Sequence, residues 1–98
     1  MISLNTRCRR SDSIVHRRIG EEAILVPIRG NVADLECIYT LNEVGQRVWH
    51  LLDGEKTVEQ VCEAVVAEFE VDAEVARGDV VGFLEELVAL KAVEVVER

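Results

Sequence analysis

The hydrophobic residues change their spacing between Leu41 and Asn42, and this change constrains the fold more than any other feature. Before it, apolar residues form short runs that partly alternate with polar ones, which is typical of strands. After it, they recur at intervals of three and four residues, which is typical of amphipathic helices. The sequence therefore predicts a sheet in the first half of the chain and helices in the second.

Three strands are expected before this border, at residues 13–19, 23–28 and 35–41. Gly20 and the two glutamates that follow it predict a tight turn between the first two strands. The connections are too short for the crossovers that parallel strands require. We therefore expect a three-stranded antiparallel sheet.

Three helices are expected after the border, each with its own start signal. Asn42 can cap the first helix, Thr57 and Gln60 match a capping box, and Asp72 is the candidate cap of the third. Trp49, the only tryptophan, is expected to lie in the core. Residues 92–96 predict a short terminal strand. Strands, three helices and a final strand give a small α+β domain, and the short links suit a winged helix-turn-helix.

Charge is distributed unevenly along the 98 residues, whose net charge is −8. Residues 1–20 hold five arginines and one aspartate, a balance of +4, and the rest of the chain has a balance of −12. A body this acidic repels phosphate backbones, so nucleic-acid binding is disfavoured. Residues 1–12 are expected to form a flexible basic N-terminal arm, either solvated or in contact with an acidic partner, and residues 13–98 a single domain.

Three cysteines, Cys8, Cys37 and Cys62, form no CxxC pair, and their odd number fits no closed set of disulfides. Reduced thiols in a cytoplasmic protein are the simpler interpretation. The N-terminal segment lacks the apolar run of a signal peptide, and the apolar run at residues 23–28 is far too short to span a bilayer. We therefore expect a cytoplasmic protein with no membrane partner.

Residues that could carry catalysis or hold a metal do not cluster in the sequence. His16 and His50 are isolated from each other and from any cysteine at metal-ligand spacing. Cys62 falls in the apolar stripe of the second helix, where a buried thiol is the simpler role. Gly78 and Gly82 lie within the third helix and form no phosphate-binding loop. We expect a binding module with no catalytic residues, metal or cofactor.

The third helix, expected to end near Leu90, carries more apolar surface than one packing face needs. A helical wheel gives a core stripe, made up of Ala76, Val80, Phe83, Leu87 and Leu90. A second stripe runs beside it, consisting of Val81, Leu84 and Val88 with Arg77 and Lys91 at its flanks. Either the helix packs between two layers of its own fold, or the second stripe lines a groove. An extended peptide suits such a groove, because it can add a strand to a sheet edge.

Two segments of the chain together form a family motif. They read LNEVGQRVWHLLDGEKTVEQV at residues 41–61 and DVVGFLEEL at residues 79–87, and a short apolar tail follows. In this pattern the chain resembles the PqqD-like family over residues 14–96. The resemblance implies a winged helix-turn-helix-like domain, with three antiparallel strands packed on three helices.

The resemblance also implies a function. Members of the family bind the leader part of a ribosomally made precursor peptide and present it to a modifying enzyme, often a radical SAM enzyme. The leader lies as an added strand on the third strand, in the cleft beside the third helix. The corresponding peptide-binding positions here are Glu36, Cys37, Ile38, Tyr39, Thr40, Arg77, Val81, Leu84, Val88 and Lys91.

Two other functions stay open at this point. A helix-turn-helix regulator would place the third helix in the major groove of DNA, although that helix carries more acidic than basic residues. A self-associating domain would pair its groove and free strand edge between two copies, as a homodimer.

Overall fold

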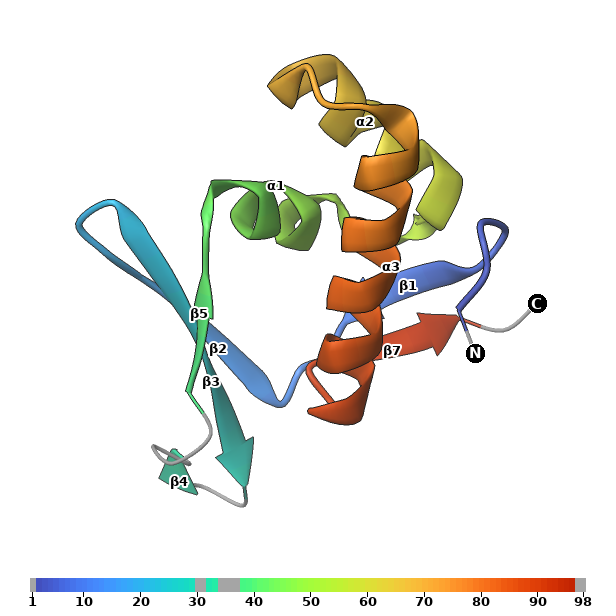
Figure 1. Ribbon diagram of the computed structural model, residues 1–98. Coiled ribbons are helices and arrows are strands. Elements are labelled where there is room, and N and C mark those ends of the chain that lie inside the picture. Colours follow the sequence, from blue (N-terminus) through green and yellow to red (C-terminus); the bar gives the residue numbers. More distant parts are fainter. Residues whose placement is uncertain (1, 30–31, 34–37, 97–98) are drawn as a thin grey trace.

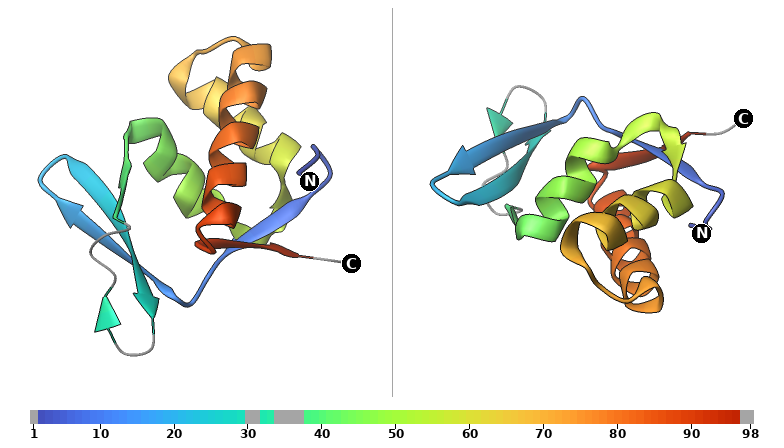
Figure 2. Two further views of the ribbon diagram at one scale, coloured as in Figure 1. Left: turned by 60° about the horizontal axis from the view of Figure 1, so that its bottom comes forward. Right: turned by 90° about the horizontal axis from the view of Figure 1, so that it is seen from above.

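The computed structural model describes residues 2–29, 32–33 and 38–96, and it is an α+β domain as predicted. The elements in chain order are β1 (Arg7–Arg10), β2 (Ile14–Ile19), β3 (Glu22–Arg29), β4 (Val32–Ala33), β5 (Tyr39–Leu41), α1 (Glu43–Leu51), β6 (Asp53–Thr57), α2 (Val58–Phe69), α3 (Ala73–Ala89) and β7 (Val93–Val96). Helix α1 lies between the β2–β3 hairpin and the other two helices in all three views (Figures 1 and 2).

The first sheet is antiparallel and is built around β3. Strand β2 pairs with β3 along its whole length, and Gly20 makes the turn with a left-handed φ of 64°, which glycine adopts without a steric penalty. Strands β4 and β5 also pair with β3. The third predicted strand, residues 35–41, is confirmed for its last three residues; residues 35–37 lie outside the described part of the chain.

A second antiparallel sheet, in the order β6-β1-β7, was not predicted, although its strand β7 confirms the terminal strand expected at residues 92–96. Residues 7–10, expected within a flexible arm, form its middle strand β1, and the Cys8 side chain there is only 2% exposed. Helix α1 ends at Leu51, and Asp53 and Gly54 begin strand β6, which the sequence did not predict. The sequence gives no signal for β1 because one cysteine among arginines makes no alternation, and its partners lie far along the chain.

All three predicted helix caps are confirmed. The Asn42 side chain accepts a hydrogen bond from the Gly45 amide at the start of α1. Thr57 and Gln60 form the capping box of α2, and Asp72 accepts from two amides of the first turn of α3. Each cap satisfies backbone donors that the first helical turn leaves unpaired, which fixes where the helices begin.

The core lies between the helices and the inner faces of both sheets. Its fully buried side chains come from β1, β3 and all three helices, and include Leu25, Val48, Val58, Val61, Val65, Val80, Leu84 and Leu87. Trp49 is 4% exposed and Cys62 is buried, both as predicted. In the described part of the chain, no helix has the length and apolar character needed to cross a membrane.

Burial of the Cys8 thiol makes the N-terminal strand a contributor to stability. We expect Cys8→Ser to lower the free energy of unfolding by about 1–3 kcal/mol, because a buried hydroxyl without a partner loses its hydration. Urea denaturation followed by Trp49 fluorescence measures this. Val95→Ser, in the neighbouring strand β7, is the control, since Val95 is exposed and its loss should cost under about 0.5 kcal/mol. Equal costs for the two variants would show that β1 is not part of the cooperative core.

Candidate functional site

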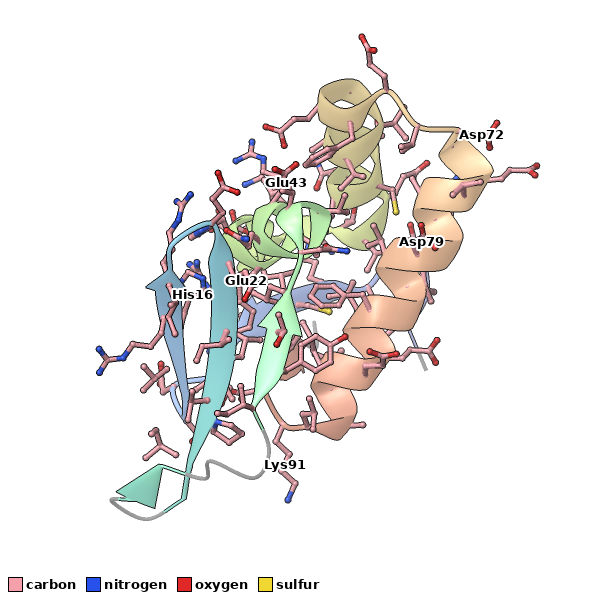
Figure 3. All side chains as sticks on the ribbon, turned by 60° about the vertical axis from the view of Figure 1, so that its left-hand side comes forward. His16, Glu22, Glu43, Asp72, Asp79 and Lys91 are labelled. Atoms are coloured by element: carbon pink, nitrogen blue, oxygen red, sulfur yellow. The ribbon has the colours of Figure 1, made fainter. Side chains whose placement is uncertain are left out.

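The candidate site is the space between strand β5 and helix α3, which run beside each other on one side of the molecule (Figures 1 and 3). Strand β5 pairs with β3 along one edge, and no described strand pairs with its other edge. An unpaired edge presents backbone donors and acceptors that an extended peptide can use. We call this space the β5–α3 groove and define it by Tyr39–Leu41, Asn42, Asp79, Phe83 and Glu86.

The position of β5 follows from two buried anchors. Leu41 pairs with Ala23 and is buried in the core, and Tyr39 pairs with Leu25 and packs against that core. Thr40 between them is exposed. The period of two along a strand thus holds one face of β5 inside the protein while its outer edge stays accessible.

Tyr39 connects the two walls of the groove. Its ring lies 5.9 Å from that of Phe83, measured between centroids, and its hydroxyl donates to a Glu86 carboxylate oxygen 2.5 Å away. Burial raises the pKa of Tyr39 to about 12, and the hydrogen bond to Glu86 and the negative charge of Glu86 add to this effect. The phenol therefore stays a neutral donor at physiological pH.

Two hollows lie at the end of the groove where β5 runs into α1. The first, of about 480 Å³, is lined by Glu21, Glu22, Tyr39, Thr40, Leu41, Asn42, Glu43 and Phe83. The second, of about 340 Å³, is lined by Asn42, Val44, Gly45, Val48, Asp79, Val80 and Phe83. We call the second hollow the α1–α3 socket. The two hollows share Asn42 and Phe83 and together form one concave end of the groove.

Gly45 keeps the socket open. A Cβ at this position would lie 3.3 Å from the Asn42 side-chain oxygen and 3.4 Å from the Phe83 ring. Both distances are tight for a methyl group, so any larger residue would push against the cap of α1 and the wall of the socket. Close packing therefore explains why the sequence motif has a glycine at position 45.

Comparison with known proteins identifies a family that matches most of the chain. Residues 22–93 match the family described as coenzyme PQQ synthesis protein D.

The chain belongs to the PqqD family.

Among solved structures, this PqqD-family chain is similar to TbiB1, described as in complex with the TbiA(beta) leader peptide. The two are 29% identical with a TM-score of 0.71, and the similarity covers 88% of this chain and 94% of the other. None of the curated proteins matches the chain in sequence. The match confirms the expected family and the expected fold.

The structure brings together only some of the peptide-binding positions expected in this PqqD-family chain. Tyr39 and Thr40 lie at the groove. Ile38 is exposed instead on the outer face of the first sheet, beside Val15 and Ile24. Glu36 and Cys37 lie outside the described residues.

The expected second stripe of α3 does not face β5. Leu84 is 0% exposed and belongs to the core. Val81 packs against that core, and Arg77 lies against α2, where it lines a small hollow with Cys62. The helical wheel located the apolar residues correctly but could not tell which flank of the core stripe the sheet would cover.

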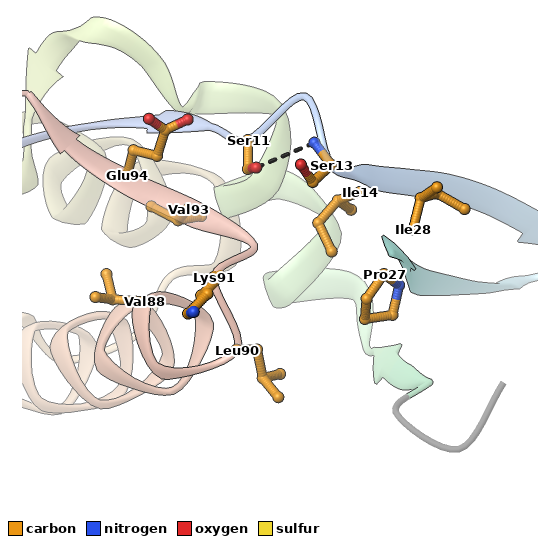
Figure 4. Close-up of a pocket in the computed structure, with 10 residues that line it drawn as sticks. All are labelled: Ser11, Ser13, Ile14, Pro27, Ile28, Val88, Leu90, Lys91, Val93 and Glu94. Atoms are coloured by element: carbon orange, nitrogen blue, oxygen red, sulfur yellow. Dashed lines mark hydrogen bonds between the residues drawn. The ribbon is translucent and has the colours of Figure 1, made fainter. Parts of the chain in front are cut away.

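Two more of the expected positions lie at the opposite end of α3. Val88 and Lys91 line a hollow of about 560 Å³ between the two sheets, together with Leu90 and Pro27 (Figure 4). The Ser13 amide donates to the Ser11 hydroxyl on the wall of this hollow. These residues lie beyond the end of the groove as defined here.

Five residues of the groove were not among the expected peptide-binding positions: Leu41, Asn42, Asp79, Phe83 and Glu86. Phe83 was expected in the core but is half-buried and faces Tyr39, and the exposed Glu86 accepts a hydrogen bond from the Tyr39 hydroxyl. Asn42 was interpreted only as a cap, and Asp79 only as a family-motif residue. On a wheel, positions 79, 83 and 86 form the other flank of the core stripe, which is the signal that could have located them.

The two histidines, isolated in the sequence, are neighbours in space. The ring centroids of His16 and His50 lie 5.3 Å apart. The His16 ring is also stacked on that of Trp49, with 6.3 Å between the centroids. Burial lowers the pKa of His16, and the nearby positive groups of His50, Arg10 and Arg18 lower it further.

In residues 2–29, 32–33 and 38–96 no group of three metal-ligating side chains occurs. Burial raises the pKa of both Cys8 and Cys62, which suits structural thiols.

Tyr39 is the only tyrosine, so its ionisation can be followed directly by phenolate absorbance. The folded-state pKa is raised, so the contribution of the protonated phenol to stability is present at neutral pH and is lost as the pH rises above the ordinary value of 10. We expect a midpoint near 12 in the folded protein, and a lower midpoint in Glu86→Gln because the negative charge is gone.

Glu85→Gln is the matched control, because Glu85 is an exposed neighbour on the other side of α3. It should leave the midpoint unchanged. Circular dichroism at each pH separates the titration from alkaline unfolding. A Glu86→Gln midpoint equal to that of the parent protein would contradict the assigned contact.

Proposed function

We propose that this chain binds the leader region of a ribosomally made precursor peptide by strand addition in the β5–α3 groove, and presents it to a modifying enzyme such as a radical SAM enzyme. The observation that carries the proposal is the open edge of β5 beside α3. Membership of the PqqD family and the similarity to TbiB1, which is described with a leader peptide, support it.

Strand addition uses the two kinds of surface that the groove offers. The free edge of β5 supplies backbone donors and acceptors, which bind any extended peptide regardless of its sequence. Side chains of the peptide alternate between two faces, and those on the inner face lie against Phe83, Glu86 and the α1–α3 socket. Backbone pairing thus gives affinity, and the socket gives selectivity.

The groove is preformed in part. Its backbone walls are held by the Leu41 anchor, the Asn42 cap and the buried stripe of α3, all of which belong to the core or adjoin it. A peptide that binds a fixed edge orders only its own chain, which limits the entropic cost of binding. The proposed role is that of a rigid platform, and no catalytic step is assigned to it.

Backbone amide NMR tests the site. Synthetic peptides covering the N-terminal regions of candidate precursors encoded beside the gene are titrated into the full chain. We expect shifts in Tyr39–Leu41 and in the segment of α3 from Asp79 to Glu86. Shifts confined to other elements, or no shift with any candidate, would count against leader binding in this groove. Sedimentation at several concentrations separates peptide binding from pairing of β5 between two copies.

The two phenylalanines provide a matched pair of variants. Phe83 and Phe69 are both half-buried and both pack against the core, but only Phe83 lies in the groove. Each change to alanine removes the same side chain and should cost comparable stability. We expect Phe83→Ala to weaken peptide binding by roughly tenfold, because central aromatic residues dominate such interfaces, and Phe69→Ala to leave it unchanged. Isothermal titration calorimetry on both folded variants measures the difference; equal affinities would place the peptide elsewhere.

A further inference from the structure

The α1–α3 socket combines apolar walls with one carboxylate, that of Asp79. The walls are Val44, Val48, Val80 and one side of the half-buried Phe83 ring. Asp79 is exposed and lines the same hollow. A purely apolar ligand would fill such a hollow but would leave the charged group beside it without a partner.

Further carboxylates surround the adjoining hollow. Glu21, Glu22 and Glu43 line it, and Figure 3 shows Glu43 and Asp79 near the end of the groove where β5 meets α1. No lysine or arginine is among the described residues that line either hollow. None of the ion pairs between described residues involves these four carboxylates.

A basic side chain lies beyond the opposite end of the groove. Lys91 lies beyond the C-terminal end of α3. In Figure 3 it lies near the end of β5 that is away from Glu43 and Asp79. A peptide lying on β5 therefore meets carboxylates near Asn42, whereas Lys91 lies beyond the other end of the groove, in a hollow that Glu94 also lines.

We infer that the α1–α3 socket takes a lysine or arginine side chain of the bound peptide, so that the leader carries a basic residue where it passes the end of β5. This inference rests on the proposed function. Lysine and arginine have an apolar stem and a charged end, which match the walls and the rim of the socket. An acidic side chain at this position would be repelled by the Asp79 carboxylate.

A selection experiment tests the residue type and needs no leader sequence. A display library of random linear peptides is selected against the full chain, against Asp79→Lys and against Glu85→Lys. The last two variants change the net charge equally, but only Asp79 lines the socket. We expect lysine or arginine to be enriched at one position in binders of the parent protein and of Glu85→Lys, and to be replaced by acidic or neutral residues in binders of Asp79→Lys.

A direct affinity measurement follows on one selected peptide. Its basic residue is replaced by norleucine, which keeps the stem and removes the charge. We expect the lysine peptide to bind the parent protein roughly twofold to fivefold tighter than the norleucine peptide, as for partly exposed ion pairs. The ratio should fall towards one in Asp79→Asn and at high salt, where the charges are screened.

The outcomes separate this inference from the function on which it rests. Binders that shift the amides of β5 but show no basic position, or a norleucine peptide that binds as tightly as lysine, would overturn the basic side chain and leave strand addition intact. A library without binders, or binders that do not shift β5, would overturn both.

Discussion

The junction between Leu41 and Asn42 determines most of the geometry described above. Leu41 is the last residue of strand β5 and is buried in the core. The next residue, Asn42, caps the first turn of α1 with its side chain. The Asn42 oxygen accepts from the Gly45 amide at 2.8 Å, and the Gln46 side-chain amide donates back to the Leu41 carbonyl oxygen. One peptide unit therefore sets both the register of β5 on β3 and the direction of α1. The socket lies directly behind this junction, so its shape depends on the same two contacts.

Helix α3 has two roles that require different sides of its surface. Its buried side, with Ala76, Leu84 and Leu87, holds the helix against the core. A neighbouring flank, with Asp79, Phe83 and Glu86, remains accessible beside β5. The helix can serve as a binding wall because its position is fixed by residues that take no part in binding. Changes on the accessible flank can therefore alter peptide preference without altering the fold.

The sequence was sufficient for features that depend on local chemistry and insufficient for those that depend on distant pairing. Asn42, Thr57 and Asp72 predict the starts of the three helices, because an N-cap needs only a side-chain oxygen and the backbone amides of the first helical turn. The wheel of α3 found its apolar residues, but packing of α2 against one flank and of the sheet against the other is decided by tertiary contacts. For the same reason the pairing of His16 with His50 could not be read from residues that lie in different elements.

The pairing of Arg7 with Val96 joins two residues that lie far apart in the sequence. Strand β1 comes before its two partners in the sequence: β6 is formed by residues 53–57 and β7 by residues 93–96. The second sheet therefore cannot close until β7 has been made, whereas the β2–β3 hairpin and the three capped helices need only local contacts. Long-range pairing of this kind slows folding, because loop-closure entropy is lost before the strands meet. The closing of β1 between β6 and β7 is thus the step that converts a set of local elements into one domain.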